Sequence, residues 1–411
     1  MKTVTLTLKT ITPLFMGGAN QQAELRTQSF KGLFRYWFRI LGGSRAEEKS
    51  LYGWGGDNAT QSKIKISIKY ENNIKNIFKF EKEFDARGYV KQNGYNYITF
   101  SLYKRFEKDP NLPGRSYIKE DEIFYITLCF SPLIKDEEIK KILASVWGAF
   151  YLGNFGSRLR RGFGSIMVTS IDYSGINENL INFVKWKIDN NNIITWYTNQ
   201  LEVIKGLFNN EPIKGIPSIK KDFKIYKLNK ESLDKIREWI TEIQKNRNGR
   251  FLANKFTLKK ITSRNEILET MGYLLMAYRS YYKHDYDIAK NILENRDKLY
   301  NKCCIKRTAF GLPLNFYFSS LKKGAMIEAK NRENNQLRRA SPVIFKIIDN
   351  SDNNSNNIYE GIFIYQKSLF IPEDVTIKLK NTELSHPDFS IIDEFFNSLL
   401  KKNILMEVYS A

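Results

Sequence analysis

Residues 153–165, GNFGSRLRRGFGS, combine a permissive backbone with concentrated positive charge and contain no acidic side chain. Glycine adopts positive φ at little cost and lets backbone N–H groups approach an anion closely, while arginine binds phosphate through two parallel hydrogen bonds. The stretch therefore predicts a site that binds the phosphate backbone of a nucleic acid. The alternative is a tight turn with solvated arginines. The residues concerned are Gly156, Arg158, Arg160, Arg161, Gly162 and Gly164.

Other glycine-rich phosphate loops fit this stretch poorly. A dinucleotide-binding fingerprint places G-x-G-x-x-G between a strand and the helix that it opens, whereas these glycines follow a predicted helix and precede a predicted strand. The P-loop pattern G-x-x-x-x-G-K-[ST] does not occur in the sequence. No nucleotide cofactor is therefore expected.

Residues typical of catalytic or metal centres are scarce. The sequence has only two histidines, His284 and His386, and neither has partners at a spacing typical of a metal site or a catalytic triad. We therefore expect no catalytic residue, no metal and no cofactor. Metal-free RNA cleavage can use Tyr, Lys or Ser for proton transfer, so a metal-independent endoribonuclease is the alternative.

A second basic group lies on the predicted helix FKGLFRYWFRILGG, which Ser29 is expected to cap and Gly42 and Gly43 to end. At helical spacing its cations gather opposite its apolar side. The cations are Lys31, Arg35 and Arg39, and the apolar side consists of Phe30, Leu33, Phe34, Trp37, Ile40 and Leu41. These cations form either a solvated outer face or, in a ferredoxin-like fold, one cleft together with the glycine–arginine stretch.

A third basic group, Arg338 and Arg339, lies in NNQLRRASP, downstream of the aromatic stretch GLPLNFYF. Exposed aromatic rings can stack on the bases of single-stranded RNA. The alternative, core packing, is the expected fate of most of Phe316, Tyr317 and Phe318.

Composition favours an anionic partner for the whole chain. The 411 residues include 65 Lys and Arg against 44 Asp and Glu, a net charge of +21. This charge favours nucleic acid over an anionic membrane, and the remaining alternative is a charge that only deters aggregation. Cys129, Cys303 and Cys304 suit neither a disulfide framework nor a zinc site, which predicts a reducing cytoplasm. With no signal-peptide pattern and no apolar run of about 18 residues, neither secretion nor membrane association is expected.

Short-range patterns place the basic groups in an α+β architecture. The first half reads strand, helix, strand, strand, helix, strand, which is the order of a ferredoxin-like (RRM-like, βαββαβ) domain with loop insertions. The strands are predicted at 4–10, 63–70, 122–130 and 164–171, and the helices at 30–41 and 136–153.

The second half shows more helical periodicity. Helices are predicted at 232–245, 264–282 and 388–402, with a hairpin around the Asn-rich loop 349–357 and a final strand, NILMEVY. Because this half also ends in a helix and then a strand, we predict two ferredoxin-like domains. The N-terminal domain covers residues 1–172 and carries the glycine-rich loop, and the helix-rich C-terminal domain covers residues 173–411.

Several stretches together resemble a known protein family. TPLFMGGA follows the first strand, LRTQSFKGLFRYWFR covers the first helix, EEKSLYGWGGD follows it, and GNFGSRLRRGFGS precedes the last strand of the first half. In this order they resemble the RAMP superfamily of CRISPR effector proteins. FGLPLNFYF and RRASPVIFKI further resemble the first subunit of the Cmr complex, the type III-B RNA-guided ribonucleoprotein of antiviral defence.

The resemblance implies a function and a set of binding residues. It implies a non-catalytic subunit that binds CRISPR RNA near the 3′ end of the guide, contributes to binding target single-stranded RNA and contacts the other Cmr subunits. It nominates the glycine–arginine residues named above, with Lys31, Arg35, Arg39, Arg26, Arg338 and Arg339. Two features depart from the family pattern. The second half has no glycine-rich loop before its last strand, and the first 283 residues lack the histidine common in processing endonucleases of the superfamily, which argues against guide maturation.

Overall fold

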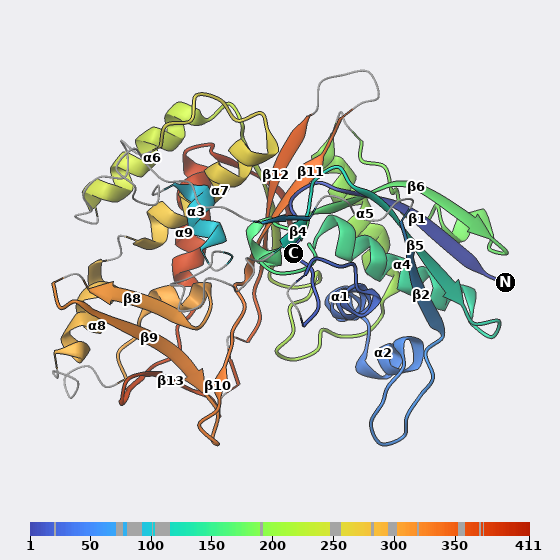
Figure 1. Ribbon diagram of the computed structural model, residues 1–411, viewed down its shortest axis with the longest axis horizontal. Coiled ribbons are helices and arrows are strands. Elements are labelled where there is room, and N and C mark those ends of the chain that lie inside the picture. The colour runs from blue at the N-terminus through green and yellow to red at the C-terminus, as the bar shows by residue number, and fades with distance from the viewer. Residues whose placement is uncertain are drawn as a thin grey trace.

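The computed structural model describes residues 1–411 except 20–21, 71–76, 80–92, 101, 103–115, 190–191, 247–255, 281–282, 295–301, 319, 352–357, 370 and 373. The described residues form a mixed α+β structure with several antiparallel sheets, which confirms the predicted class. Two four-stranded sheets and one five-stranded sheet lie along the long axis of the molecule (Figure 1), and two short strands form a separate pair. The boundary between residues 172 and 173 stays a prediction.

The first sheet is built from the N-terminal strands in the order β2-β5-β1-β6, with antiparallel neighbours throughout. Alternation of apolar and polar residues sends one side of each strand into the core, as Val4, Leu6 and Leu8 of β1 show. Its strands are β1 (Thr3–Thr10), β2 (Ile64–Lys69), β5 (Ile123–Phe130) and β6 (Ile166–Ser174).

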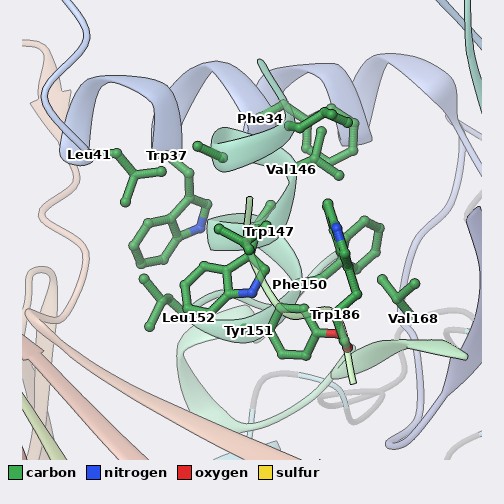
Figure 2. Close-up of a cluster of buried hydrophobic side chains, with 14 of the residues drawn as sticks. Phe34, Trp37, Leu41, Val146, Trp147, Phe150, Tyr151, Leu152, Val168 and Trp186 are labelled. Carbon is green, nitrogen blue, oxygen red and sulfur yellow. The ribbon is translucent and has the colours of Figure 1, made fainter. Parts of the chain in front are cut away.

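Two aromatic-rich helices, α1 (Thr27–Ile40) and α4 (Asp136–Tyr151), pack together beside this sheet. Figure 2 shows their contact, with Trp37 of α1 next to Trp147 of α4. The ring centroids of Phe34 on α1 and Phe150 on α4 are 6.0 Å apart. The N-cap of α1 is Arg26, whose side chain makes no capping bond, so Ser29 lies inside the helix and the predicted cap is wrong. A short helix, α2 (Arg45–Tyr52), follows and begins with a capping box between Ser44 and Glu47.

The second sheet has the order β11-β12-β7-β15. When the strands of each sheet are numbered in the order in which they occur along the chain, both four-stranded sheets have the spatial order 2-3-1-4. Every residue of β11 and β12 is buried, because this hairpin lies between the first sheet and the helices α7 and α9 (Figure 1). The elements are β7 (Phe223–Leu228), β11 (Val343–Asp349), β12 (Tyr359–Gln366), β15 (Leu405–Ser410), α6 (Leu233–Asn246), α7 (Arg264–Ser280) and α9 (Ser390–Lys401).

A third sheet lies at the far side of the second half and pairs β9 with β8, β10 and β13. Helix α8 (Lys283–Leu293) contributes to the hydrophobic cluster beneath it. Its strands are β8 (Leu314–Phe318), β9 (Lys323–Lys330), β10 (Gln336–Leu337), β13 (Thr376–Leu379) and β14 (Thr382–Leu384). The remaining elements are β3 (Ile77–Lys79), α3 (Gly94–Thr99), β4 (Ser116–Ile118), η1 (Leu159–Arg161), η2 (Glu178–Leu180), α5 (Ile193–Leu207) and η5 (Lys306–Phe310).

The two halves share packing and charge pairs. The ammonium of Lys9 on β1 lies 3.1 Å from a carboxylate oxygen of Asp349 at the end of β11. Residues of both halves, including Ile344 and Ile362, belong to the hydrophobic cluster of the first sheet. Most of the Asn-rich loop, residues 352–357, lies outside the described residues. Among the helices that the structure describes, none is long and apolar enough to cross a membrane.

Candidate nucleic-acid interface

The glycine–arginine stretch forms a tight loop between α4 and β6, at the contact between the two halves. Gly156, Gly162 and Gly164 have φ of +77°, +84° and +70°, the region in which glycine replaces other residues. A Cβ on Gly164 would collide with the carbonyl oxygen of Phe155, and one on Gly156 would lie 2.6 Å from that of Phe15. The loop therefore needs glycine for its positive φ, as predicted, and also because it passes close to the backbone of Phe15 and Phe155.

Buried polar side chains hold the loop in place. Thr12 Oγ1 donates to the carbonyl of Gly162 at 2.7 Å and accepts from the N–H of Ser165 at 2.9 Å. Asn154 Nδ2 donates to the carbonyl of Phe345 on β11 at 2.7 Å, and its Oδ1 accepts from Ser165 Oγ at 2.7 Å. Because these groups are satisfied by one another, the loop has a fixed shape on which the arginines are presented.

Arg160 and Arg161 reach from the loop to the second half. Arg160 donates to the carbonyl of Ser341 at 2.7 Å and to the hydroxyl of Tyr36 on α1 at 2.8 Å. Arg161 donates to Ser341 Oγ at 3.3 Å and lies 5.7 Å above the ring of Phe345. These partners are neutral, so the contacts orient both guanidinium groups without neutralising them.

Further arginines from the second half gather around these two. Burial and the nearby Arg279 lower the pKa of Arg161 to about 9, with smaller effects of Arg158 and Arg160. Burial and Arg160 lower the pKa of Arg339 to about 10. We call the residues Arg158, Arg160, Arg161, Arg279 and Arg339 the arginine cluster. Like charges held close together repel one another, and a bound anion would relieve that repulsion.

Arg279 and Arg307 connect this cluster to one buried acid. Arg307 donates to the carbonyl of Arg279 at 2.7 Å, and its Nε lies 3.4 Å from Asp285 Oδ2. Burial raises the pKa of Asp285 and lowers that of Arg307. Sequence reasoning missed Arg279, Arg307 and Tyr36, because each lies in an ordinary helix or turn and only the fold places them beside the loop.

The basic row on α1 has different neighbours. Arg35 Nε and Arg39 Nη1 lie 2.6 and 2.7 Å from the same oxygen of Glu48 on α2, a residue only 5% exposed. Lys31 donates to Ser62 Oγ at 3.1 Å, and burial together with Arg35 lowers its pKa. These contacts tie the row to α2 and the turn that follows it, and none of them reaches the glycine-rich loop.

The other predicted residues are dispersed. Arg26 Nε lies 3.2 Å from Glu24, and Arg338 is exposed beyond β10. Arg339 donates to Ser368 Oγ at 3.0 Å. In the aromatic stretch, Phe316 and Phe318 are buried and Tyr317 faces solvent, which agrees with the expectation that core packing takes most of the three.

A buried lysine that sequence reasoning missed links β11 to both ends of the loop. The ammonium of Lys346 donates to the carbonyl of Gly153 at 2.9 Å and lies 3.4 Å from that of Ile166. Its side chain is almost fully buried, and this burial lowers its pKa to about 7. The sequence PVIFKII does not reveal that Lys346 binds the loop, because the alternation of a strand predicts a solvent-exposed position for this lysine.

The described residues contain no group of three or more His, Cys, Asp or Glu arranged to hold a metal ion. His386 contacts the carbonyl of Val375 at 2.8 Å, and His284 is an exposed residue of α8. The three cysteines are free thiols. The site gathers guanidinium groups, which bind anions, whereas the N–H groups of Ser157, Arg161 and Gly164 donate within the chain.

Comparison with protein families matches residues 7–167 to the RAMP superfamily. The matched span runs from β1 into β6 and includes α1, α4 and the glycine-rich loop. Over these residues the chain is similar to the RAMP superfamily. The match confirms the predicted resemblance.

Two curated relatives of this chain come from Pyrococcus furiosus. CRISPR system Cmr subunit Cmr1-2 is 29% identical over 181 residues, which cover 39% of this chain and 92% of the relative. Cmr subunit Cmr1-1 is 30% identical over 159 residues, which cover 35% of this chain and 40% of the relative. The crystal structure of Cmr1 from Pyrococcus furiosus in its apo form covers 100% of this chain and 99% of its own, with a TM-score of 0.50 and 19% identity. At this identity the structural match shows a shared fold.

Proposed function

We propose that this protein is a non-catalytic RNA-binding subunit of a type III-B Cmr ribonucleoprotein. It holds CRISPR RNA near the 3′ end of the guide, contacts the other Cmr subunits and contributes to binding target RNA. The observation that carries the proposal is the arginine cluster, in which two guanidinium groups are oriented by neutral partners on both halves of the chain. Its relationship to Cmr subunits supports the choice of partner.

The geometry favours phosphate as the group that is bound. Guanidinium forks suit phosphate oxygens, and contacts with phosphate carry no sequence information. Burial and other arginines lower the pKa of Arg161 and Arg339 in the arginine cluster, which means that their charged forms are destabilised in the folded protein. A bound anion would stabilise these charged forms. We therefore expect weak sequence preference and steep salt dependence.

Fluorescence anisotropy of the purified full-length chain tests this proposal. Single-stranded RNA, single-stranded DNA of equal length and duplex RNA are titrated over a range of salt concentrations. Single-stranded RNA should bind best, and each phosphate contact should contribute about 0.7 to the slope of log K against log salt. Absence of binding at low salt would contradict an RNA site on the isolated chain.

The double variant Arg160→Gln/Arg161→Gln separates charge from position. Glutamine can still donate hydrogen bonds to Ser341 and Tyr36, so the junction between the halves is retained while two positive charges are lost. We expect weaker RNA binding and a salt slope lower by about 1.4. Lys185→Gln/Lys187→Gln removes the same charge from exposed positions elsewhere and should leave the slope unchanged. Equal slopes for the two variants would remove the loop from the site.

The same protein distinguishes two other functions. Incubation with labelled repeat RNA in EDTA should leave the RNA intact, whereas discrete products would reveal a metal-independent endoribonuclease. A scaffold whose basic surfaces contact acidic proteins would assemble with its partners after the RNA is removed by ribonuclease, and it would show no RNA-dependent salt slope.

We further infer that both four-stranded sheets belong to ferredoxin-like domains. The spatial strand order 2-3-1-4 in each sheet supports this inference. So does the chain order of the first sheet, in which α1 follows β1 and α4 lies between β5 and β6. In such a domain the loop before the last strand lies beside the first helix, which is where Arg160 meets Tyr36.

A further inference from the structure

The third sheet has one covered face and one open face, because its side chains alternate along each strand. Leu314, Phe316 and Phe318 of β8 point into the cluster that α8 completes. Between them, Tyr317 is 67% exposed, and Met326 on β9 is 42% exposed. The open face therefore presents an aromatic ring and a thioether to solvent from regular strands, where they are held in fixed positions.

Among the residues that the structure describes, none covers the surface next to the Tyr317 ring, which is 67% exposed. In the antiparallel register Tyr317 lies opposite Gly324 of β9, which has no side chain. A Cβ added to Gly324 would meet only the carbonyl oxygen of Phe316, at 3.6 Å, so space is available there. A flat ring of another molecule can consequently stack on Tyr317 without displacing part of this chain.

Cations lie at both ends of this open face. Lys322 is exposed in the turn between β8 and β9. At the other end, Gln336 of β10 reaches across the open face to Glu328 at 2.9 Å, and Arg338, two residues further on, is exposed on the same side by alternation. An aromatic ring between cations matches a single nucleic-acid strand, in which bases alternate with phosphates.

The open face adjoins the arginine cluster. The main chain of Arg339 forms two hydrogen bonds with that of Leu312, of 2.9 and 3.1 Å, just before β8 begins. The guanidinium of Arg339 turns the other way, and Arg160 is close enough to lower its pKa. β10 is an edge strand of the third sheet, and in Figure 1 it lies on the side of that sheet that faces the first half of the chain. An RNA strand bound at the arginine cluster can therefore extend onto the open face of this sheet.

We propose that the open face of β8, β9 and β10 is a second binding surface for single-stranded RNA. Tyr317 stacks on a base, Arg338 contacts phosphate on one side, and Lys322 contacts phosphate on the other. The inference rests on the proposed RNA-binding function and adds a base-stacking subsite to it. Since every base has a stacking face, this surface tolerates any sequence.

The test uses the full-length chain and single-stranded RNA with 2-aminopurine at successive positions. Wild-type protein should quench this fluorescent base at one or two positions. Tyr317→Ala should abolish the quenching and raise Kd about tenfold, whereas Tyr317→Phe, which retains an aromatic ring, should stay within about twofold of wild type. Tyr173→Ala is the matched control, because Tyr173 is also exposed but lies on β6 of the first sheet.

The outcomes separate this inference from the proposed function. If Tyr317→Ala binds like wild type while Arg160→Gln/Arg161→Gln binds weakly, the stacking surface is wrong and the arginine site stands. If Tyr317→Ala retains its RNA affinity but no longer copurifies with protein partners, the open face is a protein-docking surface and the inference is again wrong. If wild-type protein binds no RNA, the proposed function and the stacking surface are both overturned.

Discussion

Replacing Lys346 by methionine should change how the stability of the protein depends on pH. The side chain of Lys346 is only 2% exposed, and the hydrogen bonds it donates go to backbone carbonyls of Gly153 and Ile166. Burial lowers its pKa from 10.5 to about 7, so the folded protein favours the neutral amine. Methionine has a similar length and no charge, and it therefore removes the titration with little change in packing.

The sign and size follow from the two pKa values. In the unfolded chain Lys346 stays protonated up to about pH 10, whereas in the folded chain it loses its proton above about pH 7. The unfolded state thus binds more protons over this range, and the free energy of unfolding rises with pH. Each pH unit contributes at most about 1.4 kcal/mol, and because Lys346 is half protonated near pH 7, the gain between pH 7 and pH 9 is about 2 kcal/mol.

Urea unfolding at pH 7, 8 and 9, followed by fluorescence of the buried tryptophans, measures this gain. Other groups titrate alike in both proteins, so the difference between wild type and Lys346→Met isolates the lysine. The free energy of unfolding of wild type should rise relative to that of the variant by about 2 kcal/mol from pH 7 to pH 9. Parallel pH curves would refute a neutral, buried Lys346, and with it the way in which β11 is joined to the glycine-rich loop.

Two further substitutions test the framework around the loop. Glu48→Gln should lower the free energy of unfolding by about 2 kcal/mol, because it leaves Arg35 and Arg39 facing each other without their shared carboxylate. The control is Glu137→Gln, at an exposed ion pair, which should change the free energy of unfolding by less than about 0.5 kcal/mol in the same urea titration. A similar loss for both variants would contradict the special role of Glu48. Gly164→Ala should destabilise the protein by more than about 1 kcal/mol and weaken RNA binding, because φ of +70° and the carbonyl of Phe155 both oppose a side chain. Gly32→Ala, inside α1 with open space around it, should stabilise by about 0.5–1 kcal/mol, and a gain at both glycines would refute the strained loop.

Regular elements with a strong local pattern could be predicted from the sequence. Apolar side chains at helical spacing indicated α1 and α4, and Phe34, Trp37 and Phe150 are indeed buried where those helices meet. Alternation indicated the strands of the first sheet within one to three residues of their ends. Such patterns are readable because burial imposes the period of the element on nearby residues, so the information lies within a single segment.

The glycine-rich loop could also be recognised from its residues alone. Positive φ at Gly156, Gly162 and Gly164 is a property of the local backbone, and few residues other than glycine adopt it readily. The third sheet was mostly missed, because β10, β13 and β14 are two to four residues long and carry too little pattern to stand out.

The environment of each charge was decided by the tertiary structure. The sequence by itself determined a basic chain with a glycine–arginine loop, but it did not reveal that Glu48 would bind Arg35 and Arg39. Nor did it show that Arg279 and Arg339, more than a hundred residues from the loop, would lie beside Arg160 and Arg161. The energy of a charge depends on its burial and on the charges within a few ångströms, and these are set by contacts between distant segments. Local periodicity therefore determines the elements, and only their packing determines which cations remain available to bind an anion.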